Sequence, residues 1–384
     1  MRKQRTPRSL SLLLLAATVT LALLFVGCES NSGDGGGGGT TTPAAGDVTL
    51  ADGDSFRSVQ VNISTTSTWF QVIDSVVQDA KLNATLTRIS DQEPPEGTSF
   101  DIDWPEDENN VLTFQNETAG FSSVGRLNRL GNSHMVRDEV LTDEEGSLQV
   151  GVKAATDASN ATLDGIYFVA MLHSDTSASP GFFSGYVYMA FNGSGTLSFP
   201  YPNPGNDQDF SDYTNGEPYT YSVASDGKLT IPSSMVFPRD LIGAVRADGE
   251  LFVLAETRSD NSYKTIFVGI QQSEAATDAL FEGVWDDSAI CSDMSGSTPI
   301  DMWEGASVVT LDANGDGTYS DVGDPTSYPI SIDVTDDGVF ELPMGGGFSM
   351  MGAITPSGDT MVWVYPASHP EDNDYCMSVS VKTP

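Results

Sequence analysis

The residues best suited to chemistry in this 384-residue chain are the alternating oxygen-bearing side chains of Asp312, Asn314 and Asp316. This spacing is typical of the opening of a calcium loop, in which oxygens converge on a hard cation and glycine permits the bend. The twelfth position of the loop is Gly323 instead of glutamate, and β-rich segments instead of helices flank it. The run therefore has two interpretations, a tight hairpin turn or a weak Ca²⁺ site, and Ca²⁺ is the one cofactor that it suggests.

The other reactive residue types form no recognisable catalytic or zinc site. His134, His173 and His369 fall in three different parts of the chain, whereas zinc needs three or four converging ligands. The run from Gly181 to Gly185 has its serine displaced by one position from a nucleophile elbow. Phosphate-binding loops and haem attachment motifs are also missing from the sequence. We therefore predict no catalytic residue and a protein that is not an enzyme.

The N-terminus has the order of an export signal. Residues 1–8 carry four basic and no acidic side chains, and residues 10–26 are almost wholly apolar. This is the pattern of a secretory signal peptide, which we expect to end at residue 27. Gly27 followed by Cys28 resembles the lipobox of bacterial lipoproteins. The resemblance implies that Cys28 is acylated and becomes the mature N-terminus, with outer-membrane lipid as its partner.

The residues after Cys28 refine this expectation. By analogy with lipoprotein sorting, Glu29 implies the outer membrane of a Gram-negative cell; the periplasmic face and the cell surface both remain open. Residues 28–46 contain five consecutive glycines and a threonine run, which predicts a flexible lipidated linker.

Acidic residues dominate the composition. Asp and Glu number 54 against 17 Lys and Arg, which gives a formal net charge of -37 at pH 7. Nucleic acid is excluded as a partner, because phosphates are bound by clustered cations that this chain lacks. The acidic runs at 101–108, 137–145 and 369–374 fall in expected loops, so we interpret them as solvated segments that keep a tethered protein soluble.

A repeated pattern divides the rest of the chain. It consists of glycine, one residue, an aliphatic residue, three residues, glycine and then a strongly apolar run. The three copies begin at Gly125, Gly243 and Gly352. Each is followed by a similar terminal β-rich segment, ending near residues 153, 271 and 382. We predict three units, covering residues 47–154, 155–274 and 275–384, of which the first is divergent.

Each unit contains about eight short β-rich segments. In the third unit they cover 282–285, 306–311, 318–322, 328–334, 339–342, 348–355, 360–365 and 375–382. The turns between them, such as Asp337-Gly338, favour hairpins because their residues tolerate positive φ. The predicted fold class is all-β, with tandem antiparallel eight-stranded meanders closed as up-and-down barrels. A six-bladed β-propeller is the alternative.

Three of these segments are apolar on both faces: residues 185–191, 251–255 and 361–365. A strand with one wet face alternates between apolar and polar residues, so these strands must have both faces covered. We expect them to pack between units; the alternative is that they line an apolar pocket.

Two short motifs add a resemblance. Gly283-Val284-Trp285 and its counterpart Gly165-Ile166-Tyr167 resemble the first strand of lipocalin-like and avidin-like barrels. The resemblance covers the second and third units and implies that Tyr167 and Trp285 close the base of their barrels. The first half of the first unit lacks the motif. The family's ligands are small apolar molecules, but no ligand motif is present in this chain.

The remaining cysteines, Cys291 and Cys376, test the architecture. An exported chain meets an oxidising compartment, so an isolated pair predicts a disulfide. Cys291 follows the first segment of the third unit and Cys376 lies in its last. First and last strands are neighbours in a closed barrel, whereas two successive propeller blades would hold them apart. The predicted disulfide therefore favours the barrel.

These features predict a non-enzymatic cell-envelope lipoprotein that acts as a binding or structural module. One alternative is a lipocalin-like carrier of a small apolar ligand. Another is a hydrolase acting on envelope or extracellular polymers. A small apolar ligand, an envelope protein and a polysaccharide are all compatible partners, and the oligomeric state is left open.

Overall fold

The computed structural model describes residues 50–64, 68–78, 81–89, 99–103, 111–116, 121–138, 145–175, 182–200, 218–234, 240–256, 263–273, 275–293, 301–345, 348–365 and 374–384. The predicted signal peptide, Cys28, the linker and His369 lie outside these residues. So do most of the acidic runs 101–108, 137–145 and 369–374.

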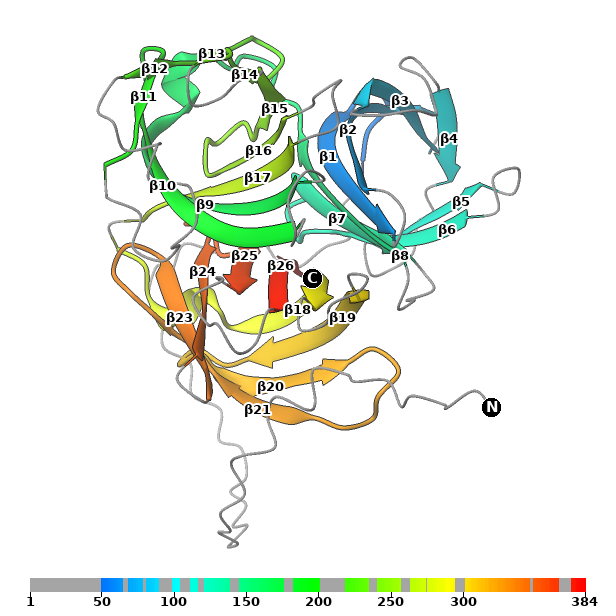
Figure 1. Cartoon of the computed structure of the whole chain (residues 1–384), viewed down its shortest axis with the longest axis vertical. Coiled ribbons are helices and arrows are strands. Elements are labelled where there is room, and N and C mark those ends of the chain that lie inside the picture. Colours follow the sequence, from blue (N-terminus) through cyan, green and yellow to red (C-terminus); the bar gives the residue numbers. More distant parts are fainter. Residues whose placement is uncertain are drawn as a thin grey trace, which may run out of the picture.

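The predicted all-β fold is confirmed. Apart from two short 3-10 turns, η2 (Asn160–Thr162) and η4 (Asp278–Leu280), every regular element among the described residues is a β-strand. The strands form three antiparallel sheets, each curled into a barrel, and the barrels lie around a common centre (Figure 1). In this part of the chain no helix has the length and apolar character needed to cross a bilayer.

Barrel 1 has eight strands in the order β4-β3-β2-β1-β8-β7-β6-β5. They are β1 (Ser55–Ser64), β2 (Thr68–Gln78), β3 (Lys81–Ile89), β4 (Ser99–Asp103), β5 (Val111–Asn116), β6 (Phe121–Leu127), β7 (Ser133–Asp138) and β8 (Glu145–Lys153). The two edge strands, β4 and β5, lie close together.

Barrel 2 has the order β12-β11-β10-β9-β17-β16-β15-β14-β13. Its strands are β9 (Asp164–Asp175), β10 (Phe182–Asn192), β11 (Thr196–Ser198), β12 (Tyr219–Thr220), β13 (Ser222–Val223), β14 (Lys228–Ile231), β15 (Leu241–Val245), β16 (Leu251–Glu256) and β17 (Tyr263–Gln271).

Barrel 3 repeats this arrangement as β21-β20-β19-β18-β26-β25-β24-β23-β22. Its strands are β18 (Gly283–Asp293), β19 (Asp301–Leu311), β20 (Asp316–Asp321), β21 (Tyr328–Ser331), β22 (Asp333–Val334), β23 (Val339–Gly345), β24 (Phe348–Ile354), β25 (Thr360–Tyr365) and β26 (Asp374–Lys382).

Barrels 2 and 3 each close through one strand that is interrupted at a single residue. Only Tyr221 separates the edge strands β12 and β13, and only Ile332 separates β21 and β22. The two halves pair with opposite edges of the sheet, with β11 and β14 in barrel 2 and with β20 and β23 in barrel 3. Nine strands therefore correspond to eight segments of chain.

The architecture is that of up-and-down barrels and not of propeller blades. The first strand of each sheet pairs directly with the last: β1 with β8, β9 with β17 and β18 with β26. In barrels 2 and 3, where the interrupted strand also joins the two ends of the sheet, closure removes the free edges that would otherwise expose unpaired backbone groups.

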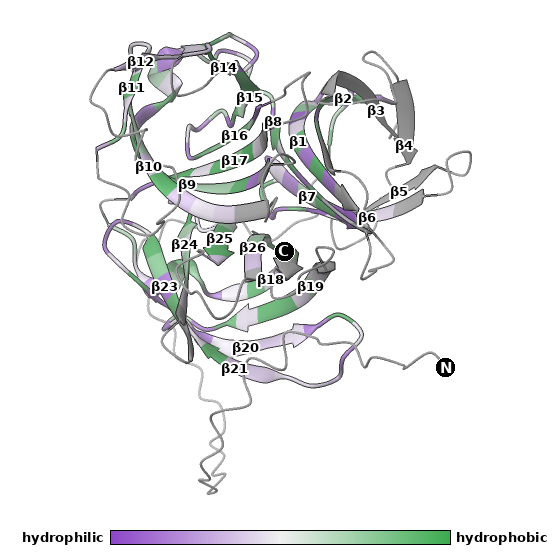
Figure 2. Ribbon diagram, viewed as in Figure 1, coloured by the Kyte–Doolittle hydropathy of each residue, from purple (hydrophilic) through white to green (hydrophobic). Residues whose placement is uncertain are grey.

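A single apolar core, the central cluster, joins the three barrels. It consists of buried apolar side chains that point away from their own barrel interiors. They come from β1, β2, β7 and β8 of barrel 1, from β9, β10 and β15–β17 of barrel 2, and from β18 and β23–β26 of barrel 3. Leu251 and Val253 of β16 belong to it, whereas Phe252 points into barrel 2. Figure 2 shows the hydrophobic residues gathered on β16, β17 and β25.

The central cluster confirms that the strands with two apolar faces pack between units. Residues 251–255 alternate between the central cluster and the interior of barrel 2, and residues 361–365 alternate in the same way in barrel 3. Each fully buried valine or leucine contributes about 1.5–3 kcal/mol. The barrels therefore form one body and are not independent domains on linkers.

The repeated glycine motif forms three equivalent hairpin turns, and these meet at one junction between the barrels. The turns connect β6 to β7, β15 to β16 and β24 to β25. In each, the amide of the second glycine donates to the carbonyl oxygen three residues earlier, in the pairs Gly131 with Asn128, Gly249 with Arg246 and Gly358 with Thr355.

Arg246 holds this junction together. Its side chain is 1% exposed and uses all five of its N–H groups. The acceptors, at 2.6–3.3 Å, belong to Asp248, Glu250, Ser357, Asp359 and Asn132. Burial would lower the pKa of Arg246, but the carboxylates of Asp359 and Asp248 outweigh that effect and raise the pKa.

The acceptors of Arg246 explain why the motif is repeated. Asn132, Glu250 and Asp359 each follow the second glycine of their copy of the motif. One arginine of barrel 2 therefore contacts the equivalent position in all three barrels. Ser133 Oγ and Thr360 Oγ1, 2.9 Å apart, link barrels 1 and 3 directly beside it.

Candidate functional site

The calcium-like run forms the hairpin between β19 and β20. Asp312 accepts hydrogen bonds on Oδ1 from the amides of Asn314, at 2.8 Å, and Asp316, at 3.1 Å. These bonds lower the pKa of Asp312. Gly315 has φ 75°, and a Cβ there would lie 2.0 Å from Ile332 O, where the barrel closes. The turn thus has a structural role that explains its glycine and its first aspartate.

The side chains of Asp312, Asn314 and Asp316 are all exposed. Among the described residues, no group of three His, Cys, Asp or Glu side chains is placed to hold a metal ion. Ca²⁺ binding at this turn stays a prediction.

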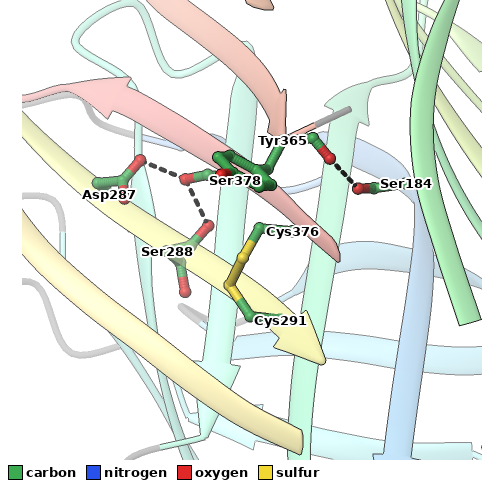
Figure 3. The surroundings of a disulfide bond; sticks show 7 residues. All are labelled: Ser184, Asp287, Ser288, Cys291, Tyr365, Cys376 and Ser378. Carbon is green, nitrogen blue, oxygen red and sulfur yellow. Dashed lines mark hydrogen bonds between the residues drawn. A yellow bond between two sulfur atoms is a disulfide. The ribbon is translucent and has the colours of Figure 1, made fainter. Parts of the chain in front are cut away.

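The disulfide between Cys291 and Cys376 is present. The two residues lie directly opposite each other on β18 and β26, the first and last strands of barrel 3. Figure 3 shows the bond beside Tyr365 and Ser378, with Ser184 of barrel 2 donating to Tyr365 O at 2.6 Å. The disulfide therefore fastens the closing seam of barrel 3 where it meets barrel 2.

The structure places Tyr167 and Trp285 inside barrels 2 and 3, at the ends of the barrels where η2 and η4 lie. Both are fully buried. Tyr167 Oη donates to Gly249 O at 2.7 Å, and Trp285 Nε1 donates to Phe281 O at 2.8 Å. Barrel 1 has Phe56 at the matching register, opposite Lys153 as Trp285 is opposite Lys382. The first unit lacks the Gly-x-aromatic motif, since Asp54 stands where the glycine would be, but it has an aromatic side chain at the same register.

The histidines do not come together. His134 is buried in barrel 1, and His173 lies on β9 of barrel 2 with Nδ1 2.7 Å from Thr265 Oγ1. His369 lies outside the described residues.

The interiors of the three barrels can be compared at one set of equivalent positions, which we call the interior row. It crosses the first, last and penultimate strands of each barrel. The row consists of Ser58, Gly151 and His134 in barrel 1, Val169, Gly269 and Phe252 in barrel 2, and Asp287, Ser380 and Met361 in barrel 3.

Barrel 1 has a neutral polar interior row. His134 Nε2 lies 3.0 Å from Ser58 Oγ and 3.1 Å from Gln149 Nε2. Because an amide nitrogen only donates, His134 Nε2 is the unprotonated nitrogen of the ring. Phe56 meets the ring edge to face, with centroids 5.3 Å apart. Burial lowers the pKa of His134 to about 4, so the ring is neutral at physiological pH.

Amide side chains continue this polar surface along β1 and β2. Gln71 donates to Gln60 Oε1, and Gln60 donates to Asn62 Oδ1 at 3.3 Å. Two buried atoms of the chain of amides, Gln71 Oε1 and Asn62 Nδ2, have no hydrogen-bond partner among the described residues. Gln71 is 5% exposed, whereas Gln60 and Asn62 are half-buried, so the polar surface becomes accessible toward the end of β1.

Barrel 2 has an interior filled by rings. Phe191 lies 4.9 Å from Tyr221 and 5.4 Å from Phe252, measured between ring centroids. Tyr167 lies 5.3 Å from both Phe191 and Phe252. Leucine, valine and methionine side chains complete the cluster.

Barrel 3 has an acidic interior row. Asp287 is buried, and burial raises its pKa although four donors oppose the shift. The donors are Ser378 and Ser380 at 2.5 Å, Trp363 Nε1 at 2.9 Å and Ser307 at 3.4 Å. Figure 3 shows Asp287 and Ser378 on the two paired strands near the disulfide.

The sequence analysis identified none of the interior row as functional. One signal was available in barrel 1: Ser58, Gln60 and Asn62 alternate with Val59 and Val61. That alternation is usually interpreted as a solvated face opposite a core face. Here the apolar face packs on the other barrels and the polar face lines the interior, which only the arrangement of the three units determines.

Comparisons with known proteins identify no relative from which a function could be assigned. No protein-family model matches the chain, and no curated protein matches it. Among solved structures, a double mutant of transferrin binding protein B from Haemophilus parasuis Hp5 is 7% identical, with a TM-score of 0.30 over 87% of this chain and 76% of that one.

Two further structures are similar at the same level. Transferrin binding protein B from Neisseria meningitidis is 8% identical, with a TM-score of 0.27 over 87% of this chain and 77% of that one. A protein of unknown function from Nostoc punctiforme is 10% identical, with a TM-score of 0.22 over 58% of this chain and 96% of that one. At these TM-scores the likenesses carry no argument, and function must be inferred from the chain's own residues.

Proposed function

We propose that this chain is a lipid-anchored protein of the bacterial outer membrane that acts as a non-enzymatic binding module. Its ligand is a small neutral molecule rich in hydroxyl groups, such as a saccharide, and the ligand binds in the interior of barrel 1. The acyl anchor and linker keep the module at the membrane.

The observation that carries the proposal is the polar interior of barrel 1. A buried polar atom without a partner costs about 1–3 kcal/mol, and the amides described on β1 and β2 have two, Gln71 Oε1 and Asn62 Nδ2. The interior cluster around the row of barrel 2 is apolar, so the scaffold itself does not require amides at that level. A binding role explains why barrel 1 retains them.

The chemistry of these groups defines the ligand class. Gln71 Oε1 accepts and Asn62 Nδ2 donates, so together they match a group that can do both. A hydroxyl is such a group, and a sugar presents several close together. The interior side chains around the amides, from Ser58 to Gln149, are uncharged, with His134 neutral at pH 7. The charged Lys153, at the Phe56 end of the barrel, is paired with Asp54 Oδ2 at 2.8 Å. This neutrality favours an uncharged ligand.

The contact between Ser58 and His134 does not support a hydrolase. A nucleophile pair needs a base that titrates near the working pH and a third group that orients it. Burial lowers the pKa of His134 to about 4, and the groups that contact its ring, Ser58, Gln149 and Phe56, include no carboxylate to orient it. The pair therefore lacks both requirements.

The carrier of an apolar ligand has less support than the saccharide module. The apolar cluster inside barrel 2 is occupied by side chains in ring contact. An apolar ligand would have to displace them.

Calorimetric titration of the full-length lipoprotein in detergent tests the ligand class. We expect maltose or N,N′-diacetylchitobiose to bind, and palmitate not to bind. Gln71→Leu should weaken sugar binding about tenfold, since it removes one hydrogen bond worth about 1 kcal/mol or more. Gln78→Leu makes the same change on the exposed side of β2 and serves as the matched control. Absence of sugar binding, or equal loss in both variants, would contradict the proposal.

The anchor has a separate test. Cys28→Ser should abolish metabolic labelling with palmitate and release the protein from the membrane fraction. A labelled or still membrane-bound Cys28→Ser protein would exclude acylation at this residue, and it would leave the sugar titration unaffected.

A further inference from the structure

Barrel 3 differs from the other two in its charge. Residues 275–384 contain nineteen acidic residues and a single basic residue, Lys382. A cleft or interior surrounded by charge of one sign concentrates ions of the opposite sign. Barrel 3 is therefore the part of the molecule that most favours a cation.

Lys382 itself shows how the interior of barrel 3 holds an ammonium group. Its Nζ lies 4.9 Å from the ring centroid of Trp285 and donates to Leu280 O at 2.8 Å. Burial, together with Arg129, lowers the pKa of Lys382 to about 8. The combination of an aromatic face and an oxygen acceptor is a common environment for ammonium ions.

A second pair of groups with this chemistry lies on β20. Tyr319 and Asp321 are on the interior face of that strand, in the same cross-strand rows as Trp285 and Asp287. Tyr319 is 8% exposed, and neither its hydroxyl nor the buried Oδ2 of Asp321 has a hydrogen-bond partner among the described residues. The ring of Tyr328 stacks on Tyr319, with centroids 5.3 Å apart.

Asp287 provides a contrast within the same row. Its carboxylate already accepts hydrogen bonds from Ser378, Ser380, Trp363 and Ser307. Asp321 lies two strands away, about 10 Å at the backbone, and lacks such donors. Asp287 is therefore satisfied by the protein, whereas Asp321 and Tyr319 have capacity for a ligand.

We propose that the interior of barrel 3 binds a small primary ammonium ion, whose N–H groups donate to Asp321 and Tyr319 Oη. The carbon chain of the ion lies against the rings of Tyr319 and Tyr328. This site is independent of the saccharide site in barrel 1, and the failure of either proposal leaves the other standing.

An organic ammonium fits these groups better than a metal ion. Zinc needs three or four protein ligands and Ca²⁺ needs six to eight oxygens, and no group of three His, Cys, Asp or Glu side chains placed for a metal occurs among the described residues. Two stacked rings add attraction for an organic cation and none for a hydrated metal ion.

The test is calorimetric titration of the full-length lipoprotein at low ionic strength with n-butylammonium chloride, with 1-butanol as the uncharged counterpart. We expect n-butylammonium to bind and 1-butanol not to bind. Asp321→Asn should weaken n-butylammonium at least tenfold, and Tyr319→Phe about threefold to tenfold. Asp321→Asn is expected to fold, because burial raises the pKa of this carboxyl and the amide removes a disfavoured charge.

Asp336→Asn is the matched control, since it removes one negative charge from an exposed acid elsewhere in barrel 3. We expect it to change the affinity less than twofold. Equal weakening by Asp321→Asn and Asp336→Asn would show diffuse attraction to an acidic surface and overturn the site. Failure of the wild-type protein to bind n-butylammonium, or equal binding of 1-butanol, would overturn it as well.

Discussion

Barrels 1 and 2 have the same geometry at the interior row and opposite chemistry. In both, a glycine on the last strand lies beneath a ring from the penultimate strand. A Cβ on Gly151 would lie 2.2 Å from His134 Cε1, and a Cβ on Gly269 would lie 2.2 Å from Phe252 Cε1. The neighbouring first-strand residue is Ser58 in barrel 1 and Val169 in barrel 2.

The difference separates what the fold needs from what function needs. The scaffold accepts a glycine beneath a ring at this row in barrels 1 and 2, because nothing larger than glycine fits there, and it accepts Ser380 with Met361 in barrel 3. It does not require a polar ring, since Phe252 fills the position in barrel 2 with no hydrogen bond to satisfy. His134 and its partners are therefore the part of the row that a binding role must explain.

The largest expected effect concerns the frame that the two barrels share. Arg246→Ala should lower the free energy of unfolding by about 3–5 kcal/mol, because it leaves the fully buried Asp359 without its cation. Urea unfolding followed by circular dichroism measures this. Asp248→Ala is the control: Asp248 is an exposed partner of the same arginine, so its loss should cost about 1 kcal/mol or less. Equal losses of unfolding free energy in Arg246→Ala and Asp248→Ala would mean that the buried junction does not hold the barrels together.

Much of this frame could be predicted from the sequence, and the failures have local causes. The segment expected at 282–285 is part of β18, which continues to Asp293. The prediction ended too early because Asp286 and Asp287 are polar and interrupt the apolar pattern. Asp286 pairs with Arg126 of barrel 1, and three of the four donors to Asp287 are more than 75 residues away. A local pattern cannot reveal such partners. The disulfide was predictable, because closing a barrel brings its first and last strands together whatever the side chains between them.

The interior row was not predictable for the same reason. Ser58 and His134 are 76 residues apart, and only the register of β1, β8 and β7 aligns them. The glycine motif was visible as a repeat, but its role was not. Arg246 reaches Asp359 across 113 residues, and a repeat says nothing about which copies meet.

The second prediction distinguishes the His134 ring of barrel 1 from the Phe252 ring of barrel 2 by the pH dependence of stability. Burial lowers the pKa of His134 from 6.5 to about 4, so below pH 6.5 the unfolded chain binds a proton that the folded chain does not. Stability from this residue is therefore complete above pH 6.5 and falls as the pH drops to about 4, by about 3 kcal/mol in total. Hydrogen exchange of β7 and β8 peptides at pH values from 7 to 4 measures it.

Carboxylates also titrate in this range, so the matched variant is His134→Phe, which carries the ring of barrel 2. The wild-type protein should lose more stability than His134→Phe between pH 6.5 and 4. Parallel pH curves for the two proteins would mean that His134 is protonated in the folded state.

The third prediction concerns the two glycines. Gly151→Ala and Gly269→Ala should each destabilise by about 1–3 kcal/mol, because the new methyl group overlaps the ring above it. Shortening the ring residue should relieve the clash, so the cycles Gly151→Ala with His134→Ala and Gly269→Ala with Phe252→Ala should show coupling above 0.5 kcal/mol. Urea unfolding of the single and double variants provides the values. Additive effects would show that these glycines serve another purpose.

The smallest expected effect on stability comes from converting the row of barrel 1 toward that of barrel 2. The variant Ser58→Val, His134→Phe, Gln149→Leu removes all three hydrogen-bonding partners together, so none remains buried and unpaired. Such replacements are often neutral or stabilising, and we expect a change within about 1 kcal/mol of wild type. If the polar row exists for a ligand, the same variant should lose maltose or N,N′-diacetylchitobiose binding measured by calorimetry. A variant that unfolds would instead make the polar row a structural requirement of barrel 1, and one that folds and binds sugar as tightly as wild type would remove the row from the site.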